Sequence, residues 1–486
     1  MSTETRSGLP AWKPADLPNP PVPRGLQWIG VVGPGVIVLG LSIGSGEFLL
    51  GPAVFVRHGL TLLWVTAVSV FLQTIFNTEL MRYTLATGEP VFTGFMRTPP
   101  SSTFWAWIYS VLYFLQAGWP AWAANAAGAV YFLFARRLAG PDDATVVYLI
   151  GIATFLASTA VLFIGRRIER TLELFNWALI VGILSSFLVL ALVFVPGSIW
   201  GSAAGGLIGF DTAEGRFNFL PAGVDWVLLA ALVAYSGAGG MANVTLSNWA
   251  RDRGYGMGER VGYIPAAVGG KKVNLAHSGF IFQPTPDNIR RWHGWWRIVR
   301  ADQWGVFFAG GLLGMVLPAL LYVTFLPRGT DIRGLGIAAA LASSIGAQAG
   351  PLLAGVIAFL GVWILFKTQL DQMEAMVRAL TDMLWTGSAR IRAWRGGDVR
   401  KIYYAVLLTL VIWGIIALRL AQPIVLLQIG ANVASVVFVI TSLHLLYINT
   451  RLLPRQLRPP GWRRAMLVFM ALFYGFFSAL SVSTLF

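Results

Sequence analysis

The sequence of 486 residues lacks cysteine entirely and carries little charge. Without cysteine, disulfides and thiolate metal sites are excluded. Only 12% of the residues are charged, against about 25% in soluble globular proteins. The chain has four histidines, none at a zinc-ligand spacing, and no glycine-rich phosphate loop that ends in Lys-Ser or Lys-Thr. These absences give no support to an enzyme or to ATP-driven transport.

The composition is dominated by apolar residues. They make up 56% of the chain, and the mean hydropathy is +0.68. Many apolar runs reach the roughly 20 residues that a helix needs to cross the hydrocarbon core of a bilayer, which predicts an all-α polytopic membrane protein. We expect eleven membrane spans, at about residues 28–54, 59–83, 104–135, 145–165, 172–196, 225–249, 303–326, 345–376, 402–421, 424–448 and 464–485.

The net charge of +15 could indicate nucleic acid as a partner, but the positions of the basic residues favour a membrane topology instead. Once the spans are placed, most Lys and Arg residues fall in the connections on one side. Cytoplasmic connections carry such an excess, so the sequence predicts a multi-pass plasma-membrane protein with a cytoplasmic N-terminus and the C-terminus outside. The lipid bilayer is then the expected partner, nucleic acid is not, and the oligomeric state, a monomer included, stays open.

Two segments outside the spans have a distinct character. Residues 1–27 are polar and proline-rich and lack the apolar core of a signal peptide, so we expect a flexible cytoplasmic tail. The long cytoplasmic loop at 251–302 contains Trp292, Trp295 and neighbouring apolar residues on one helical face, with arginines around them. This pattern predicts an amphipathic helix lying in the headgroup layer, and both a plain linker and a gate remain open as its role.

Glycines interrupt two of the predicted spans. In the first, "LGLSIGSGEFLL" (39–50), Gly44 and Gly46 precede the carboxylate of Glu47, and a charge at bilayer depth costs roughly 2.5 to 3.5 kcal/mol. In the sixth, residues 234–248 contain three glycines followed by Met241. The two spans belong to halves that run in opposite directions, and interrupted helices at matching positions of inverted halves indicate the binding site of a secondary transporter. Close helix packing through glycine is the alternative.

The first span also carries a family resemblance. "GPGVIVLGLSIGSGEFLLGP" resembles the first span of the Nramp divalent-metal transporters, 59–73 is similar to their second span, and 165–174 to the start of their fifth. The resemblance implies divalent-cation transport and a LeuT-type fold of two inverted five-helix repeats plus an eleventh helix. The boundaries then expected are 28–196 for the first repeat, 197–224 for an extracellular loop, 225–448 for the second repeat and 449–486 for the eleventh helix.

The resemblance also implies a cation site, in an altered form. The metal-binding Asp of the family falls on Gly44 and its Asn ligand on Glu47, so the carboxylate moves by three residues. In the sixth span the family pattern Ala-x-x-Met-Pro-His retains its Met as Met241 but has Asn243 in place of the His beside the proton route. Altered proton coupling is therefore expected. The residues expected around the cation, which is a transported substrate and not a cofactor, are Gly44, Ser45, Glu47, Ala238, Met241 and Asn243, with Glu47, Met241 and the carbonyls of Gly44 and Ala238 as the metal contacts.

Several polar residues have alternative interpretations. Glu47 could bind the cation, titrate a proton, or only cap a second half-helix from its first turn. Gln428 and Asn432 share one face of the tenth span, and the resemblance places that face near the metal pathway. Lys367 and Asp371 form an i, i+4 pair, either a neutralised pair at the inner membrane edge or a gate in which Lys367 replaces a coupling ion.

Three further polar residues lie within or at the ends of spans. Asn125 and Gln116, in the third span, can hydrogen-bond across helices or line the pathway. Glu79, near the end of the second span, is expected at the interface together with Arg82.

Three functions are compatible with these patterns. The first is a secondary transporter of divalent metal cations that works by alternating access. The second is a transporter of a small organic substrate, such as an amino acid or an amine, on the same fold. The third is a receptor or scaffold that does not transport, for which the long cytoplasmic loop is the only support.

Overall fold

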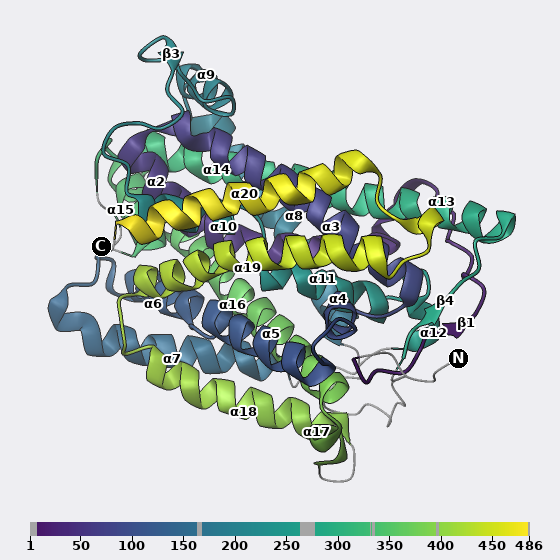
Figure 1. Cartoon of the computed structure of the whole chain (residues 1–486). Coiled ribbons are helices and arrows are strands. Elements are labelled where there is room, and N and C mark those ends of the chain that lie inside the picture. Colours follow the sequence, from purple (N-terminus) through teal and green to yellow (C-terminus); the bar gives the residue numbers. More distant parts are fainter. Residues whose placement is uncertain are drawn as a thin grey trace.

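The computed structural model describes residues 7–162, 168–262, 278–330, 332, 336–394 and 398–484. Helices dominate this part of the chain, and its only strands are four of two residues each: β1 (Lys13–Pro14) pairs in parallel with β4 (Phe280–Ile281), and β2 (Phe210–Asp211) pairs antiparallel with β3 (Arg216–Phe217). Most helices run along one long axis, and the N-terminal and C-terminal segments lie at opposite ends of it (Figure 1). The all-α prediction is confirmed.

Nine helical runs in the described residues are long and apolar enough to cross a membrane. The first run joins α1 (Pro34–Ser42), the π-helical segment η2 (Ile43–Leu50) and α2 (Gly51–His58). The fifth run joins α13 (Pro286–Arg300), η5 (Ala301–Phe308) and α14 (Ala309–Phe325). The others are α3 (Leu63–Thr87, preceded by the short η3, Leu60–Leu62), α7 (Ala144–Val161, preceded by η4, Pro141–Asp143), α8 (Ile168–Phe194), α16 (Pro351–Gly387), α18 (Val399–Ala417), α19 (Pro423–Arg451) and α20 (Gly461–Ser483).

Two pairs of shorter helices supply the remaining predicted spans, the third and the sixth. They are α5 (Ser102–Ala117) with α6 (Ala121–Ala135), and α10 (Trp226–Tyr235) with α11 (Met241–Asp252). Together with the nine long runs they account for the eleven predicted spans. The connections hold η1 (Gly25–Gly30), α4 (Val91–Met96), α9 (Gly197–Gly206), α12 (Gly258–Val261), α15 (Ile337–Ala349), α17 (Ala389–Ala393) and η7 (Arg455–Leu457).

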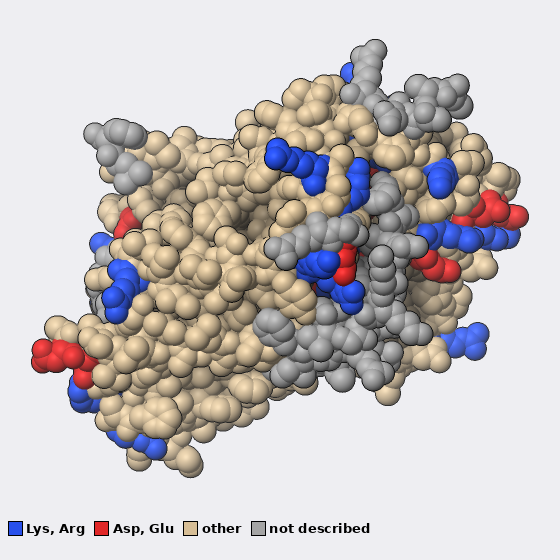
Figure 2. All heavy atoms as spheres, turned by 90° about the horizontal axis from the view of Figure 1, so that it is seen from below, with Lys and Arg blue, Asp and Glu red and all other residues tan. Residues whose placement is uncertain are grey.

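The outer surface has the character of a membrane protein. Many large apolar side chains are exposed on the long helices, among them Leu192 and Val193 of α8 and Leu472 of α20, each about two-thirds exposed. Figure 2 shows a face on which a broad uncharged surface separates a few charged side chains at one end from a larger group that extends from the middle to the other end. Apolar side chains on a surface of this size are stable only against lipid, so the bundle is built to lie in a bilayer.

Besides the sixth span, two further predicted spans are not continuous helices. The third breaks at residues 118–120 because Pro120 has no N–H to continue the ladder of hydrogen bonds, and Gln369 on α16 accepts the N–H of Ala123 in the first turn of the new helix, at 3.2 Å. The eighth, predicted at 345–376, is divided at Gly350, whose φ of +94° ends α15 before α16 begins. Only α16 is long enough to cross the membrane.

The predicted amphipathic helix in the loop at 251–302 is present, but its position differs. It is α13, and it continues without interruption through η5 into the seventh span, so it is not a separate helix. Trp292 and Trp295 are buried against the protein, and the indole of Trp295 donates to the carbonyl of Pro18 at 2.9 Å. The apolar face therefore packs on the N-terminal segment. Residues 263–277 of the same loop lie outside the described residues.

The N-terminal segment is not a free tail in its described part. Residues 7–24, which we call the N-terminal strap, cross the end of the bundle in extended form, held by the β1–β4 pairing and by Asn288, whose side-chain oxygen accepts the N–H of Leu17 at 3.2 Å. Leu17 is completely buried. Because the strap buries apolar side chains and pairs its backbone, the expectation of a flexible tail is wrong for these residues.

Glu89, between α3 and α4, joins the strap to the bundle. Its carboxylate accepts hydrogen bonds from Trp12 of the strap at 3.0 Å, from Tyr83 at 2.8 Å, and from the N–H of Gly279 at 2.7 Å, and it forms a buried ion pair with Arg97. Burial alone would raise the pKa of Glu89, but the Arg97 guanidinium outweighs it, and the pKa lies below its ordinary value.

We expect Glu89→Gln to lower the stability of the protein at neutral pH by about 3 to 5 kcal/mol, because it leaves Arg97 buried without its partner. A depressed carboxyl pKa contributes stability above the unfolded value of about 4.3 and loses it as the pH falls through the folded pKa. The melting temperature of the wild type in detergent should therefore fall more steeply below about pH 5 than that of the variant. Parallel pH profiles would contradict the role assigned to Glu89.

Candidate cation site

The first span does not break at its glycines, contrary to the sequence prediction. Residues Ile43–Leu50 form a π-helix, with the N–H of Gly51 donating to the carbonyl of Gly46, and the residues at its two ends keep right-handed helical angles. Pro52 follows and cannot donate to the ladder, and a π-turn is a common way to absorb such a defect at a functional position. The carbonyl of Gly46 is consequently bonded within the helix and is not released as it would be in an unwound segment.

The two glycines of this segment allow close approach to neighbouring helices. An added Cβ at Gly44 would lie 2.1 Å from the hydroxyl of Thr368 on α16, and one at Gly46 would lie 2.0 Å from the carbonyl oxygen of Tyr235 at the end of α10. No side chain fits in either place. The glycine-packing alternative therefore holds for the first span, and it places Glu47 directly beside the sixth span.

A buried carboxylate fixes the start of the first span. Asp302 of η5 accepts the N–H groups of Gly33 at 3.0 Å and Gly35 at 2.8 Å, and Pro34 occupies the first helical position between them. These are the free donors at a helix N-terminus, where negative charge is favoured. The Gly-Pro-Gly opening is thus a capping structure, and Asp302, 267 residues away from Gly35 in sequence, carries no local signal of this role.

The sixth span does break, as predicted. α10 ends at Tyr235, α11 begins at Met241, and the residues between include Gly237, Gly239 and Gly240 with φ of +115°, +82° and +54°. Only glycine adopts such angles at little cost, so the three glycines are required by the backbone itself. The carbonyls of Gly237 and Ala238 accept no hydrogen bond from the described residues.

Side chains from two other helices hold this break open. Gln116 of α5 bridges it, because its amide nitrogen donates to the carbonyl of Gly239 at 2.7 Å and its oxygen accepts the N–H of Met241 at 2.9 Å. From α3, Gln73 donates to the carbonyl of Ser236 at 2.8 Å and Ser69 to that of Val233 at 2.6 Å. Gln116 was recognised in the sequence only as a polar residue within a span, and Gln73 and Ser69 were missed, because their partners are distant in sequence.

Glu47 lies at the centre of this arrangement. It is completely buried, and neither carboxylate oxygen has a hydrogen-bond partner among the described residues. The hydroxyl of Ser42 and the N–H of Gly237 lie near this carboxylate and favour its negative charge, and so does the ammonium of Lys367. The capping alternative fails, because the first span has no second half-helix N-terminus and no side chain caps α2. A buried carboxylate without hydrogen bonds is costly unless a charge is brought to it.

Lys367 and Asp371 are near this carboxylate and not at a membrane edge. Both are completely buried, their ion-paired atoms are 2.8 Å apart, and Asn176 of α8 donates to Asp371 at 3.5 Å. A Cβ at Gly40 of α1 would lie 2.0 Å from the Lys367 nitrogen. The ammonium therefore lies between the first span, α8 and α16, where it faces both Asp371 and Glu47. Of the two alternatives for this pair, its position beside Glu47 favours the one in which Lys367 acts as a fixed cation.

The two sixth-span candidates have different surroundings. Met241 is fully buried at the first turn of α11, where its N–H is bound by Gln116. Asn243 is also buried, and its amide nitrogen donates to the side-chain oxygen of Asn77 on α3 at 2.9 Å. The remaining oxygen of Asn243 and the remaining nitrogen of Asn77 have no partner among the described residues. This pair of amides cannot titrate.

Two other predicted residues, Ser45 and Asn125, have hydrogen-bond partners other than Glu47. Ser45 donates to the carbonyl of Leu41 at 3.1 Å and accepts from the indole of Trp122 at 2.9 Å. Asn125 donates back to the carbonyl of Ala121 in its own helix at 2.8 Å, and within the part of the chain that the structure describes it has no hydrogen bond to another helix. The structure therefore leaves Ser45 with a packing role beside the site.

Asn432 binds outside the centre of the site. Its side chain donates to the carbonyl of Val227 at 3.2 Å and accepts from Ser481 at 2.8 Å, which joins α19 to α10 and α20. Its neighbour on the same face, Gln428, contributes its backbone carbonyl to Asn432 at 2.9 Å. None of these contacts reaches Glu47, so the tenth span supports α10 and not the carboxylate directly.

A network of buried ion pairs joins α11, the second helix of the sixth span, to α16. Arg251 binds Asp252 at 2.7 Å and Asp382 at 3.0 Å, while Arg378 pairs with Asp252 and binds Glu374 at 2.5 Å. All five side chains are buried. These ion pairs hold α11, which follows the backbone break, against α16, which carries Lys367.

No protein-family model and no curated protein matches the sequence. Solved structures do match over nearly the whole length. A histidine-to-alanine variant of the Eremococcus coleocola manganese transporter aligns with a TM-score of 0.68 and 16% identity over 95% of this chain and 89% of that chain. The chain has the fold of a manganese transporter.

Two further structures of that transporter agree. A glutamate-to-glutamine variant gives a TM-score of 0.68 at 15% identity over 97% of this chain and 90% of the other, and a complex with an aromatic bis-isothiourea compound gives 0.65 at 17% over 95% and 89%. The LeuT-type, Nramp-like fold expected from the sequence is confirmed. At this identity the likeness establishes the fold, and the site has to be argued from its own residues.

Proposed function

We propose that this protein is a secondary transporter of divalent metal cations that binds the cation at Glu47 and works by alternating access. The observation that carries the proposal is the buried carboxylate of Glu47, whose oxygens have no hydrogen bond of good geometry among the described residues, near the break of the sixth span, where the carbonyls of Gly237 and Ala238 accept none either. Cations are bound in such places by carboxylate and carbonyl oxygens together. The metal contacts proposed are Glu47, the carbonyl of Ala238 and the thioether of Met241, with the Gly44 carbonyl on the π-helical side.

The cation is the substrate in this account, and no chemical step is needed. The manganese transporters that share the fold support a cation over an organic substrate. The multi-pass plasma-membrane location with a cytoplasmic N-terminus remains part of the proposal, supported by the charge distribution and by the opposite positions of the two chain ends (Figure 1).

Lys367 acts in this proposal as a tethered cation. Its ammonium neutralises Asp371 and weakens the attraction of Glu47 for a metal, so it sets the affinity of the site. We expect Lys367→Met, which removes the charged end of the side chain and keeps an unbranched apolar stem, to strengthen divalent-cation binding about tenfold, the equivalent of about 1.4 kcal/mol. The variant should also be less stable without metal, because Glu47 and Asp371 stay buried without a compensating charge. Calorimetry and melting temperatures measure the two effects, and weaker binding in the variant would contradict the role of competitor.

Proton coupling is proposed to be weak or altered. Asn243 and Asn77 form a neutral amide pair where a titratable group would be needed to carry a proton. We therefore expect less than one proton to accompany each metal ion into liposomes, measured with a pH-sensitive dye in the lumen. Acidification of the lumen in step with metal entry, at one proton or more per ion, would show that another group supplies the coupling.

The identity of the cation tests the proposed ligand set. A thioether favours softer transition metals over the alkaline earths, which prefer oxygen. We expect Mn²⁺ to bind the purified protein more tightly than Mg²⁺, and Met241→Ala to reduce that preference. Calorimetric titration of both ions into both proteins makes the comparison. Tighter binding of Mg²⁺ to the wild type, or no divalent binding, would favour an organic substrate instead.

A further inference from the structure

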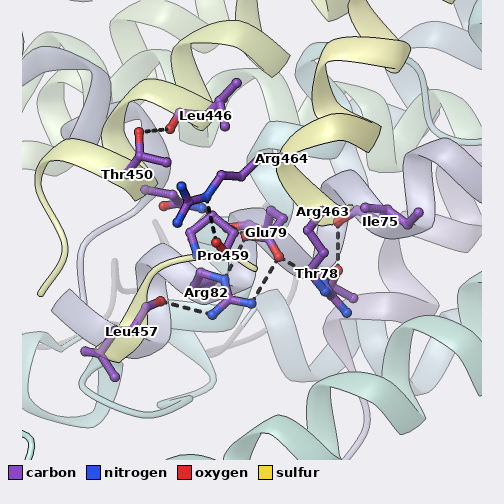
Figure 3. A network of polar contacts seen from close by, with 11 residues as sticks. Ile75, Thr78, Glu79, Arg82, Leu446, Thr450, Leu457, Pro459, Arg463 and Arg464 are labelled. Atoms are coloured by element: carbon purple, nitrogen blue, oxygen red, sulfur yellow. Dashed lines mark hydrogen bonds and ion pairs between the residues drawn. The ribbon is translucent and has the colours of Figure 1, made fainter. Parts of the chain in front are cut away.

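A cluster of arginines lies where α13, α3 and the connection between α19 and α20 meet. At its base, Glu79 of α3 binds Arg82 at 2.7 Å and Arg463 of α20 at 2.9 Å. Both guanidinium groups also lie over the ring of Trp296, at 4.5 and 5.2 Å. Figure 3 shows the side chains of Arg82 and Arg463 converging on Glu79. Glu79 and Arg82 are buried within the protein, and their position at the membrane interface stays a prediction.

Three arginines donate hydrogen bonds to backbone carbonyls of the connection between α19 and α20. Arg82 donates to the carbonyl of Leu457 at 3.0 Å and Arg464 to that of Pro459 at 2.7 Å (Figure 3). Arg458 donates to the carbonyl of Leu453 at 2.9 Å. Arg458 and Arg464 use only their Nε atoms for this. Both residues are exposed, and no hydrogen bond from their terminal nitrogens is present among the described residues.

Positive charge exceeds negative charge strongly at this surface. The one carboxylate at the base, Glu79, is already shared by two guanidinium groups. Among the described residues no ion pair reaches the exposed arginines around it, which are Arg297, Arg300, Arg451, Arg455, Arg458 and Arg464. Trp462, about half exposed, lies at the start of α20 beneath the guanidinium of Arg463, at 4.7 Å.

We propose that this surface binds the phosphate headgroup of an anionic phospholipid. The arginines lie at the ends of membrane-spanning helices, and Trp462 is the kind of aromatic side chain that marks the headgroup level. Basic pockets between membrane helices recognise anionic headgroups, and guanidinium groups bind phosphate oxygens in pairs. Arg458 and Arg464 bind the phosphate, Trp462 lies along the upper acyl chain, and the buried Glu79 base keeps the surface in shape.

The test compares two double variants of equal charge. Arg458→Gln with Arg464→Gln removes the proposed contacts, and Arg390→Gln with Lys401→Gln removes two exposed basic residues near α17 and the start of α18. Each protein is reconstituted in nanodiscs of phosphatidylcholine with a minor fraction of phosphatidylglycerol, and retained phosphatidylglycerol is measured by native mass spectrometry. We expect the first variant to lose affinity by about fivefold for each arginine, while the control stays near the wild type.

Two outcomes would overturn the proposal. Equal losses in both variants would show that only the overall charge attracts the lipid. Displacement of phosphatidylglycerol by millimolar inorganic phosphate would show a site for the free anion and not for a lipid. Because transport is not the readout, failure here leaves the proposed cation site untouched.

Discussion

Glu47→Gln is expected to weaken the binding of divalent cations about a hundredfold or more, while the protein still folds and inserts. Glutamine has the same shape, so packing against Gly314 on α14 is preserved, but the amide offers a neutral oxygen in place of a full negative charge. A hundredfold corresponds to about 2.7 kcal/mol, a modest figure for one charged ligand in a buried site. The folded variant should stay stable in the absence of metal, because a neutral amide costs less to bury than a carboxylate.

The matched control for this change is Asp302→Asn, which also neutralises a completely buried carboxylate close to the first span. Asp302 caps α1 and touches no proposed ligand, so its loss should lower the melting temperature and leave the cation affinity within about threefold. Calorimetric titration of Mn²⁺ into both variants separates the two roles. Unchanged affinity in Glu47→Gln would reduce Glu47 to a structural residue.

The second large effect is expected for Gly46→Ala. The added methyl would lie 2.0 Å from the carbonyl oxygen of Tyr235, which is backbone and cannot rotate away. The first span and α10 must then separate, at a cost of about 3 kcal/mol, and the separation moves Glu47 away from the sixth-span break. We expect a clear drop in the melting temperature together with a loss of transport.

Gly182→Ala in α8 provides the control, because an added methyl there meets nothing within 4 Å. Alanine in an open helical position should stabilise the protein by about 1 kcal/mol through its higher helix propensity. Opposite signs for the two glycines are the expected result. If Gly46→Ala were tolerated as well as Gly182→Ala, the close contact between the first span and α10 would not exist.

The sequence predicted the class of fold because that class depends on local patterns. Apolar run lengths mark the spans, and the three glycines of 237–240 mark a break that needs positive φ at each of them. The same reasoning failed for Gly44 and Gly46, because two glycines are compatible both with an unwound segment and with a helix that packs closely. The choice depends on Thr368 and Tyr235, which come from other parts of the chain.

The charged residues show the same division. Glu47 could be singled out from its position, since a carboxylate in an apolar run is costly wherever it lies. The position of Lys367 at the site, and not at a membrane edge, depends on how far α16 extends, and the helix runs to Gly387. The hydrogen bonds of Gln73 and Gln116 to the backbone of the sixth-span break could not be predicted from the sequence, because a polar residue within a span does not reveal which backbone groups it will bind.

Uptake into proteoliposomes tests the central claim most directly. Liposomes containing the wild type should accumulate Mn²⁺ in a saturable way, faster than protein-free liposomes and faster than liposomes with Glu47→Gln, and Mg²⁺ should compete poorly. Neutral amino acids should leave the rate unchanged. Mn²⁺ entry equal to that of protein-free liposomes, in a preparation that instead accumulates an amino acid or an amine, would contradict the account.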